Sequence, residues 1–302
     1  MNSKRLIINA DDLGMSRGIT DGILCAHREG VVTSASLVVN QAGSEYAVAQ
    51  LGKYPALGVG IHLNICQGAP LLPPQRVATL VGRDGRFYPP AQVIQRLWRW
   101  QTSACEIEAE FRAQIRWMKD RGLSITHGDS HHHLHLYPCA LAPFRSALLA
   151  EGIRFARAPR HQHWPRNGYI GGSYAGPTYR RLLVSAYNEL VQVMFFRPLV
   201  TPDYCLVCQP QYRGRLERLA EGLKLALESI PPGVYELACH PGLREPASYG
   251  DLYWRERREL ELSILTDPAF RAVIEQHNIE LINYPQLVVA GCAAATTLGV
   301  SR

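Results

Sequence analysis

The segment 126–135 reads THGDSHHHLH and places five of the chain's 11 histidines within nine residues. Imidazole binds divalent metals and carries protons near neutral pH, so this density indicates metal or proton chemistry. One ion cannot take all five rings. If the segment is extended, His131, His133 and His135 share one face, whereas a turn would disperse them. A surface histidine tract is the alternative, but the apolar residues that follow favour a semi-buried functional position.

Two adjacent carboxylates, Asp11 and Asp12, follow the apolar run 6–9 near the N-terminus. Neighbouring side chains point to opposite sides of an extended strand, but at a bend both can face one cavity. One of them could then bind a metal while the other takes a proton. The alternative is that Asp12 or Ser16 only caps the next helix.

Two further histidines stand in or directly after apolar runs. His62 lies within 57–65 beside glycines, which let other groups approach the backbone closely. A lone strand histidine is, however, more often a hydrogen-bonded core residue than a ligand. His240 ends the run 234–239, and the proline and glycine after it turn the chain sharply. An imidazole with a pKa of about 6.5 suits general acid catalysis there.

Strand-like and helical patterns alternate along the whole chain. Ser16 predicts a helix that ends near Gly30, and Ser103 with Glu106 forms a capping-box pattern for a helix that ends at Gly122. Alternation of this kind indicates a parallel sheet, and about seven units fit a barrel better than an open sheet. We therefore expect a single-domain α/β fold, an irregular (β/α) TIM-like barrel, with catalytic groups where strands end. The predicted strands are 6–9, 34–39, 57–65, 124–127, 153–156, 234–239 and 279–283.

The barrel is expected to span 1–290 and to carry two insertions. The first, 68–90, is rich in proline and glycine and predicts a loop over the site, and the second, 160–202, is apolar and basic. The last residues, 291–302, are small and weakly patterned and predict a disordered tail.

Composition excludes several classes of protein. The net charge is +6, but the arginines are scattered and no nucleic-acid motif occurs, so we expect no nucleic-acid partner. The eight cysteines lie mostly inside apolar segments and predict reduced thiols, including the pair Cys205 and Cys208. No apolar run is long enough for a spanning helix, and no signal-peptide core follows Arg5. These features predict a cytoplasmic protein.

Five segments, in order, resemble the signatures of the YdjC-like carbohydrate deacetylases. They are NADDLG (9–14), VTSASL (32–37), GIHL (60–63), THGDSHHHLH (126–135) and ELACHPG (236–242). The resemblance covers most of the chain. It implies an irregular (β/α) barrel that removes acetyl groups from N-acetylated sugars with the help of a divalent metal.

The resemblance also implies a role for each matching residue. Asp12, His62 and His131 would ligate the metal. One carboxylate and two imidazoles leave positions open for water and a substrate carbonyl, and this set accepts Zn or Mg. Asp11 would deprotonate the attacking water, and His240 would give a proton to the departing amine.

Four more residues near these motifs are expected to support the site. Asp129, His133 and His135 would orient the ligands from outside. Arg157 matches a basic family position and is expected to contact either the sugar or the base.

The substrate is suggested by the apolar segment 182–199, which lies beside Arg180, Arg181 and Arg197. Such a segment could rest on a membrane interface or hold a lipid aglycone, and an ordinary amphipathic core helix is the alternative. It resembles the hopanoid-biosynthesis-associated branch of the family, which implies an N-acetylglucosaminyl hopanoid substrate and peripheral contact with the inner membrane.

Two other functions stay open. A soluble chitooligosaccharide deacetylase is the alternative within the enzyme class. A metal- or sugar-binding protein without catalysis is the alternative outside it, although the presence of both Asp11 and His240 argues against this. The sequence leaves homo-oligomerisation undecided.

Overall fold

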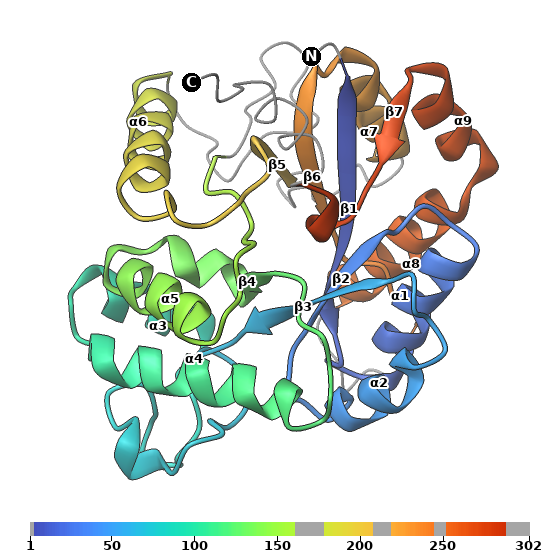
Figure 1. The fold of residues 1–302 in the computed structure, drawn as a ribbon. Coiled ribbons are helices and arrows are strands. Elements are labelled where there is room, and N and C mark those ends of the chain that lie inside the picture. Colours follow the sequence, from blue (N-terminus) through green and yellow to red (C-terminus); the bar gives the residue numbers. More distant parts are fainter. Residues whose placement is uncertain (1–2, 161–177, 208–218, 245–251, 288–302) are drawn as a thin grey trace, which may run out of the picture.

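The central element of the computed structural model is β1 (Lys4–Leu13), which stands in the middle of a seven-stranded sheet (Figure 1). The structure describes residues 3–160, 178–207, 219–244 and 252–287. The strand order is β4-β3-β2-β1-β6-β5, and β7 pairs with β1 on the edge that β2 also uses. All of these pairings are parallel. The other strands are β2 (Ser34–Leu37), β3 (Gly58–Leu63), β4 (Gly128–Ser130), β5 (Tyr204–Val207), β6 (Gly233–Cys239) and β7 (Ile279–Leu281).

The segment 153–160 joins the two edges of this sheet. Arg157 N donates to Gly128 O of β4 at 3.1 Å, and Cys205 N of β5 donates to Arg160 O at 2.8 Å. The sheet therefore curves round towards closure, and the predicted irregular (β/α) barrel is confirmed. The expected strand at 153–156 is present only as single β-bridges, and β5 was not predicted.

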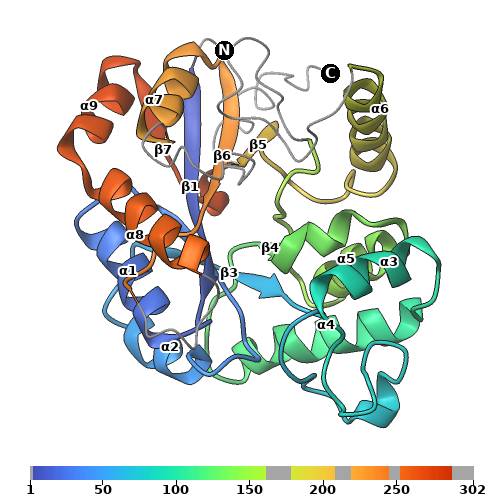
Figure 2. The same ribbon diagram turned by 180° about the vertical axis from the view of Figure 1, so that it is seen from behind.

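Helices cover the outside of the sheet. In both ribbon views α1, α2, α8 and α9 lie along one flank, and α3, α4 and α5 lie along the other (Figures 1 and 2). The helices are α1 (Arg17–Arg28), α2 (Ser44–Leu51), α3 (Pro90–Trp98), α4 (Ala104–Lys119), α5 (Pro138–Ala150), α6 (Thr178–Met194), α7 (Leu219–Ser229), α8 (Leu252–Thr266) and α9 (Pro268–Gln276), with 3-10 turns η1 (Pro74–Arg76), η2 (His131–Leu136) and η4 (Tyr284–Leu287).

Both predicted helix starts are confirmed, but one in a modified form. Ser16 caps α1 by accepting a hydrogen bond from Ile19 N at 3.2 Å. Ser103 accepts from Glu106 N at the start of α4, whereas the Glu106 carboxylate accepts from Thr79 N at 2.7 Å instead of closing the capping box. The box residue therefore ties the 68–90 segment to α4. The apolar stripe of α4 is fully buried: Ile107, Phe111, Ile115 and Met118.

A β-bulge interrupts β1 where the two aspartates stand. The pairing register with β2 shifts between Ala10 and Leu13. Asp12, inside the bulge, has a φ of 71°, in the left-handed region that residues with a β-carbon rarely adopt. A bulge breaks the alternation of side chains along a strand. The bend that we expected after the strand is therefore a bulge within it.

The two expected insertions differ in how much of them the structure describes. The first, 68–90, buries Val77, Leu80 and Phe87 in the main core. The second contains α6, while its residues 161–177 and the expected tail 291–302 lie outside the described residues. Among the helices that the structure describes, none combines the length and apolar character needed to cross a bilayer.

The six cysteines within the described ranges are free thiols. Cys205 is buried in β5, in agreement with the prediction of a core thiol, and Cys208 lies outside the described residues.

Candidate metal centre

The site lies at the carboxyl ends of β1, β3, β4 and β6, where parallel-strand barrels place their catalytic groups. Asp11 and Asp12 come from the bulge of β1, and His240 directly follows β6. His62 of β3 stands opposite Asp129 of β4 in the strand register. Residues from four strands thus meet in one buried space.

Asp12, His62 and His131 bring three possible metal-binding atoms together. Asp12 Oδ1 lies 3.0 Å from His131 Nδ1 and 3.5 Å from His62 Nε2. The two nitrogens are 3.3 Å apart. Asp12 Oδ1 forms no hydrogen bond of acceptable geometry with the described residues, although it is buried. One carboxylate oxygen and two imidazole nitrogens that converge in this way fit a divalent cation.

Asp12 is held in its charged form. Burial by itself would raise its pKa, but His131 and Arg258 keep the pKa of this carboxyl well below its usual range. Arg258 Nη2 of α8 donates a hydrogen bond to the second oxygen, Oδ2. That contact leaves Oδ1 directed at the two histidines.

His62 is oriented by a carboxylate on its far side. Its Nδ1–H donates to Asp129 Oδ1 at 2.8 Å, and Ser36 Oγ lies 3.2 Å from the same nitrogen. Burial disfavours the charged ring, but Asp129 and the two site aspartates raise the pKa of His62 to about 9. A carboxylate on one ring nitrogen leaves the other, Nε2, to face a metal, as is usual for metal-binding histidines.

Gln67 contacts the far side of His131, as Asp129 contacts the far side of His62. His131 Nε2–H donates to Gln67 Oε1 at 3.2 Å, which leaves Nδ1 as the atom that faces Asp12. Asn64 fixes the Gln67 backbone, because its Oδ1 accepts from Gln67 N at 3.1 Å. The loop after β3 therefore orients the second imidazole.

Asp11 is bound by a fully buried arginine. Arg157 donates from Nη1 to Asp11 Oδ2 at 2.8 Å and from Nη2 to Oδ1 at 2.6 Å, and Asn9 Nδ2 donates to Oδ1 at 2.8 Å. Burial opposes the negative charge, but Arg157 holds the pKa of Asp11 well below its usual range. Of the two contacts expected for Arg157, the structure shows the one with Asp11.

The same guanidinium serves two more buried carboxylates. Its Nη2 lies 2.8 Å from Asp129 Oδ2 and 2.8 Å from Glu236 Oε1. Three carboxylates therefore share the single positive charge of Arg157.

His240 faces Asp11 from the end of the neighbouring strand, β6. Its Nε2 lies 3.9 Å from Asp11 Oδ2, and its Nδ1 lies 4.0 Å from Glu261 Oε2. The backbone N of His240 donates to the same Glu261 oxygen, which fixes the turn after β6. Burial lowers the pKa of His240.

The remaining histidines of the 126–135 segment are dispersed by a turn. His132 and His133 have left-handed backbone angles inside η2, so the segment does not stay extended. His135 Nδ1 accepts from Ser130 Oγ at 2.6 Å, and its ring stacks on Phe144. The orientation of the ligands by His133 and His135 stays a prediction. Of the open alternatives for this segment, the turn is the one observed.

The ring of His127 accounts for the glycine at position 60. The His127 ring lies so close to Gly60 that an added β-carbon would come within 2.2 Å of it. The ring stacks on Tyr284 with centroids 3.8 Å apart, and burial lowers its pKa to about 3. His127 is therefore a neutral core residue.

Several contributors were not predicted from the sequence. Glu236 stands in a quoted motif, and Ser36 follows the alternation of 34–39, so both could have been found by strand periodicity. Gln67 and Arg258 carry no such signal. Arg258 lies 246 residues from the Asp12 carboxylate that it contacts.

Two curated relatives match nearly the whole of this chain. A carbohydrate deacetylase of Brevibacillus brevis is 33% identical over 94% of this chain and 99% of its own length. A chitooligosaccharide deacetylase of Serratia marcescens is 28% identical over 94% of this chain and 99% of its own length.

One solved structure also matches the fold. A protein of Enterococcus faecalis V583, whose name refers to cellobiose-phosphate cleavage, superimposes with a TM-score of 0.74 at 26% identity. The match covers 94% of this chain and 99% of that one. The family model described as YdjC-like protein matches residues 5–276, which include every site residue described above. The chain therefore belongs to the YdjC-like family.

Proposed function

We propose that this protein is a metal-dependent N-deacetylase that hydrolyses the acetamide of an N-acetylglucosamine-type sugar. As a member of a family whose named relatives are carbohydrate deacetylases, the chain is a hydrolase of a linear amide C–N bond. The observation that carries the metal-dependent mechanism is the convergence of Asp12, His62 and His131 next to Asp11 and His240.

Asp12, His62 and His131 would hold one divalent ion, Zn or Mg. A bound ion would polarise the acetamide carbonyl and make water easier to deprotonate. The protein orients its three ligand atoms in advance, since Asp129 fixes His62 and Gln67 fixes His131. Preorganised ligands favour binding because little freedom is lost.

Asp11 takes a proton from the water that adds to the carbonyl carbon. Its low pKa keeps it ionised throughout the physiological range, and the bound ion, by acidifying the water, would offset the weak basicity of this carboxylate. Arg157 holds both carboxylate oxygens, so the base cannot rotate away. The expected role of Arg157 is thus to position Asp11.

His240 gives a proton to the amine nitrogen as the C–N bond breaks, and the products are acetate and a free amino sugar. Its Nε2 lies 3.9 Å from Asp11 Oδ2, so a proton taken by Asp11 can pass to His240 with only a small movement. The departing amine therefore receives the proton that Asp11 took from the water, and no proton from bulk solvent is needed.

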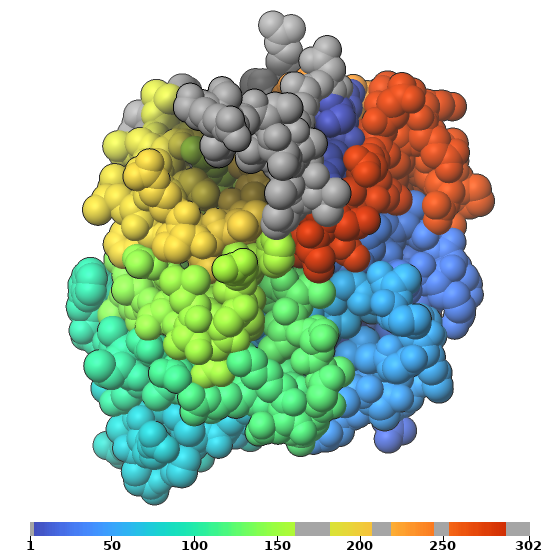
Figure 3. Space-filling model, viewed as in Figure 1, coloured from blue at the N-terminus to red at the C-terminus, as the bar shows by residue number. Residues whose placement is uncertain are grey.

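We further propose that the sugar carries a lipid, as in an N-acetylglucosaminyl hopanoid. The support is α6, where five large apolar side chains are more than half exposed, among them Leu182 and Leu183 at 66% each. The space-filling view shows this helix, in yellow, at the molecular surface (Figure 3). Apolar side chains gathered on one helix are typical of contact with a lipid or membrane interface. The other three exposed apolar side chains of α6 are Leu190, Val193 and Met194.

The alternative substrate is a soluble chitooligosaccharide, which is favoured by the Serratia relative named for that activity. Acetate release by the metal-loaded protein from an N-acetylglucosaminyl hopanoid in detergent and from diacetylchitobiose separates the two. Release from the lipid substrate alone supports the lipid proposal, and release from the soluble sugar alone contradicts it.

A double variant, Leu182→Ser/Leu183→Ser, tests the role of α6 directly. We expect it to lower the rate with the lipid substrate and not with a soluble one. Trp100→Ser, just after α3 and outside α6, is the matched control, because Trp100 is similarly exposed at 69%. Metal binding without acetate release from any acetylated glycan would favour a non-catalytic binding protein.

A further inference from the structure

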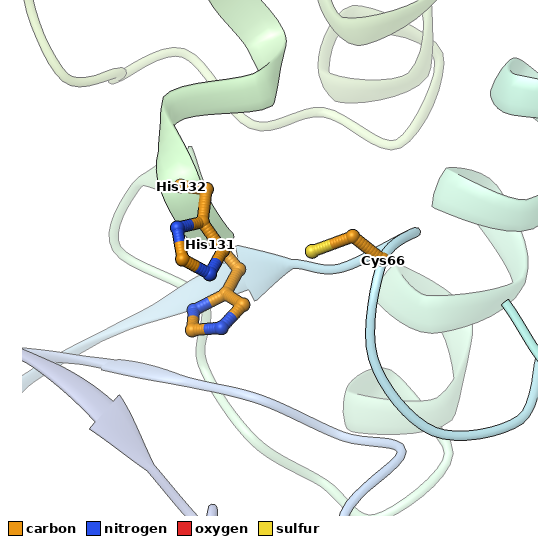
Figure 4. Close-up of side chains that lie close together, drawn as sticks. All are labelled: Cys66, His131 and His132. Atoms are coloured by element: carbon orange, nitrogen blue, oxygen red, sulfur yellow. The ribbon is translucent and has the colours of Figure 1, made fainter. Parts of the chain in front are cut away.

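We propose that Cys66, His131 and His132 form a second cation site, selective for thiophilic divalent ions such as Zn²⁺ and Cd²⁺. One donor atom from each of these residues lies within 4.8 Å of the other two. Figure 4 shows the Cys66 sulfur pointing towards the two imidazole rings, which lie one above the other. The second site shares His131 with the Asp12 and His62 cluster.

The chemistry of the donor set distinguishes the two sites. Asp12, His62 and His131 offer one oxygen and two nitrogens, which suit several divalent ions. Replacing the carboxylate by a thiol shifts the preference to softer ions, since thiolate ligands select Zn and similar metals over Mg. Mg²⁺ is therefore expected to bind at the first site only.

The backbone of η2 holds the two histidines in place. His132 has φ 54° and ψ 22°, a left-handed conformation that places its ring edge-on against His131 with centroids 4.4 Å apart. Residues in this conformation are concentrated at functional sites. The same turn that disperses the later histidines therefore brings this pair to Cys66.

Solvent reaches this cluster at His132. Cys66 is 2% exposed, whereas His132 is an exposed residue. A cation can thus reach His132 from solvent and then bind the thiol inside, where the thiol proton passes to water as the sulfur–metal bond forms. Tetrahedral zinc with its usual bond lengths sets its sulfur and nitrogen donors about 3.5 Å apart, so modest side-chain rotations would close the observed spacing.

Occupation of this site would draw His131 away from Asp12, whose Oδ1 now lies 3.0 Å from His131 Nδ1. An excess of a thiophilic ion would then inhibit the enzyme by removing one ligand of the first site. This consequence rests on the proposed function, whereas the binding itself does not.

Titration of the reduced protein with Cd²⁺, followed by the ultraviolet thiolate-to-cadmium absorbance, tests the binding. We expect the wild type to develop this absorbance to a plateau, Cys66→Ser to lose it, and His132→Ala to need about tenfold more Cd²⁺ for the same signal. Cys105→Ser is the matched control, because Cys105 is an exposed thiol away from this cluster and its loss should leave the Cys66 signal unchanged.

Three outcomes would overturn the second site: no thiolate absorbance in the wild type, a Cd²⁺ signal that survives Cys66→Ser, or an unchanged affinity in His132→Ala. A second arm measures Cd²⁺ inhibition of acetate release, each variant relative to its own rate without Cd²⁺. Cys66→Ser should need more Cd²⁺ for half inhibition. Loss of acetate release in all proteins would count against the proposed function, and the absorbance result would still decide the site.

Discussion

Asp11 and Asp12 are adjacent aspartates on one strand, yet their carboxylates have different partners. Both oxygens of Asp11 accept hydrogen bonds from Arg157, which is fully buried. Asp12 has one oxygen bound by Arg258 and the other directed at two imidazoles. The first carboxylate is immobilised and available to a proton, whereas the second has a free oxygen available to a cation.

The bulge in β1 produces this difference. In a regular strand the two side chains would point to opposite faces of the sheet. The left-handed φ of 71° at Asp12 turns its side chain into the same space as Asp11. A single irregular residue therefore gives the site two carboxylates that can take separate roles.

Arg157→Met should have the largest effect, on the Asp11 side of the comparison. It leaves three buried carboxylates without their cation, and breaking a buried ion pair costs about 3 to 5 kcal/mol of unfolding free energy. Urea denaturation measures the loss. Arg160→Met is the control, since the Arg160–Glu189 pair is partly exposed and should contribute under about 1 kcal/mol. Equal losses in the two variants would show that the buried cluster is not stabilising.

The Asp12 side is tested next by the same substitution at two histidines of one segment. His131→Gln should lower divalent-ion affinity by more than the roughly 100-fold that loss of an outer partner costs. His135→Gln should lower it much less, because His135 contacts Ser130 and Phe144. Calorimetric titration with Zn²⁺ measures both. If His135→Gln were the more damaging, the assignment of His131 would be wrong.

Asp129→Asn should weaken cation binding by about 10- to 100-fold, since the neutral amide no longer fixes and polarises His62 as a carboxylate does. The fold should tolerate the isosteric change. Ser36→Ala, which removes the longer 3.2 Å contact to the same nitrogen, should have a smaller effect. The reverse order would assign the orientation of His62 to the serine.

Gln67→Ala should have the smallest effect, a loss of only a few-fold in Zn²⁺ affinity, on the order of one neutral hydrogen bond. It frees His131 to adopt either tautomer. Gln67→Glu, which restores an acceptor for His131 Nε2–H, should rescue the affinity. Failure of that rescue would show that Gln67 does not set the tautomer.

Much of this site follows from a simple rule, that chemistry-bearing residues come directly after apolar runs in an alternating chain. Asp11, Asp12, His62 and His240 all satisfy it, because parallel strands bring their carboxyl ends to one edge. The rule fails for Arg258, which joins the site from α8 through tertiary packing alone. It also fails for the 131–135 turn, since a run of histidines has no period that separates an extended strand from a 3-10 turn.

The fold was predictable to a similar extent. The capped helices α1 and α4 begin at the serines that the sequence indicates, Ser16 and Ser103, because a side-chain cap is a local signal. The bulge in β1 contains no glycine that would indicate a left-handed residue in the sequence. The strand β5 is only four residues long, too short to show a reliable alternation of apolar and polar residues. Local sequence signals are weakest where the tertiary structure imposes the backbone conformation.

The division between the two aspartates is tested most directly by Asp11→Asn and Asp12→Asn, each assayed for Zn²⁺ affinity and for acetate release. Asp11→Asn should keep its cation while acetate release falls by about 10² to 10⁴, the usual contribution of a general base. Asp12→Asn should lose the cation. If Asp11→Asn lost the cation and Asp12→Asn kept it, the two roles would have to be exchanged.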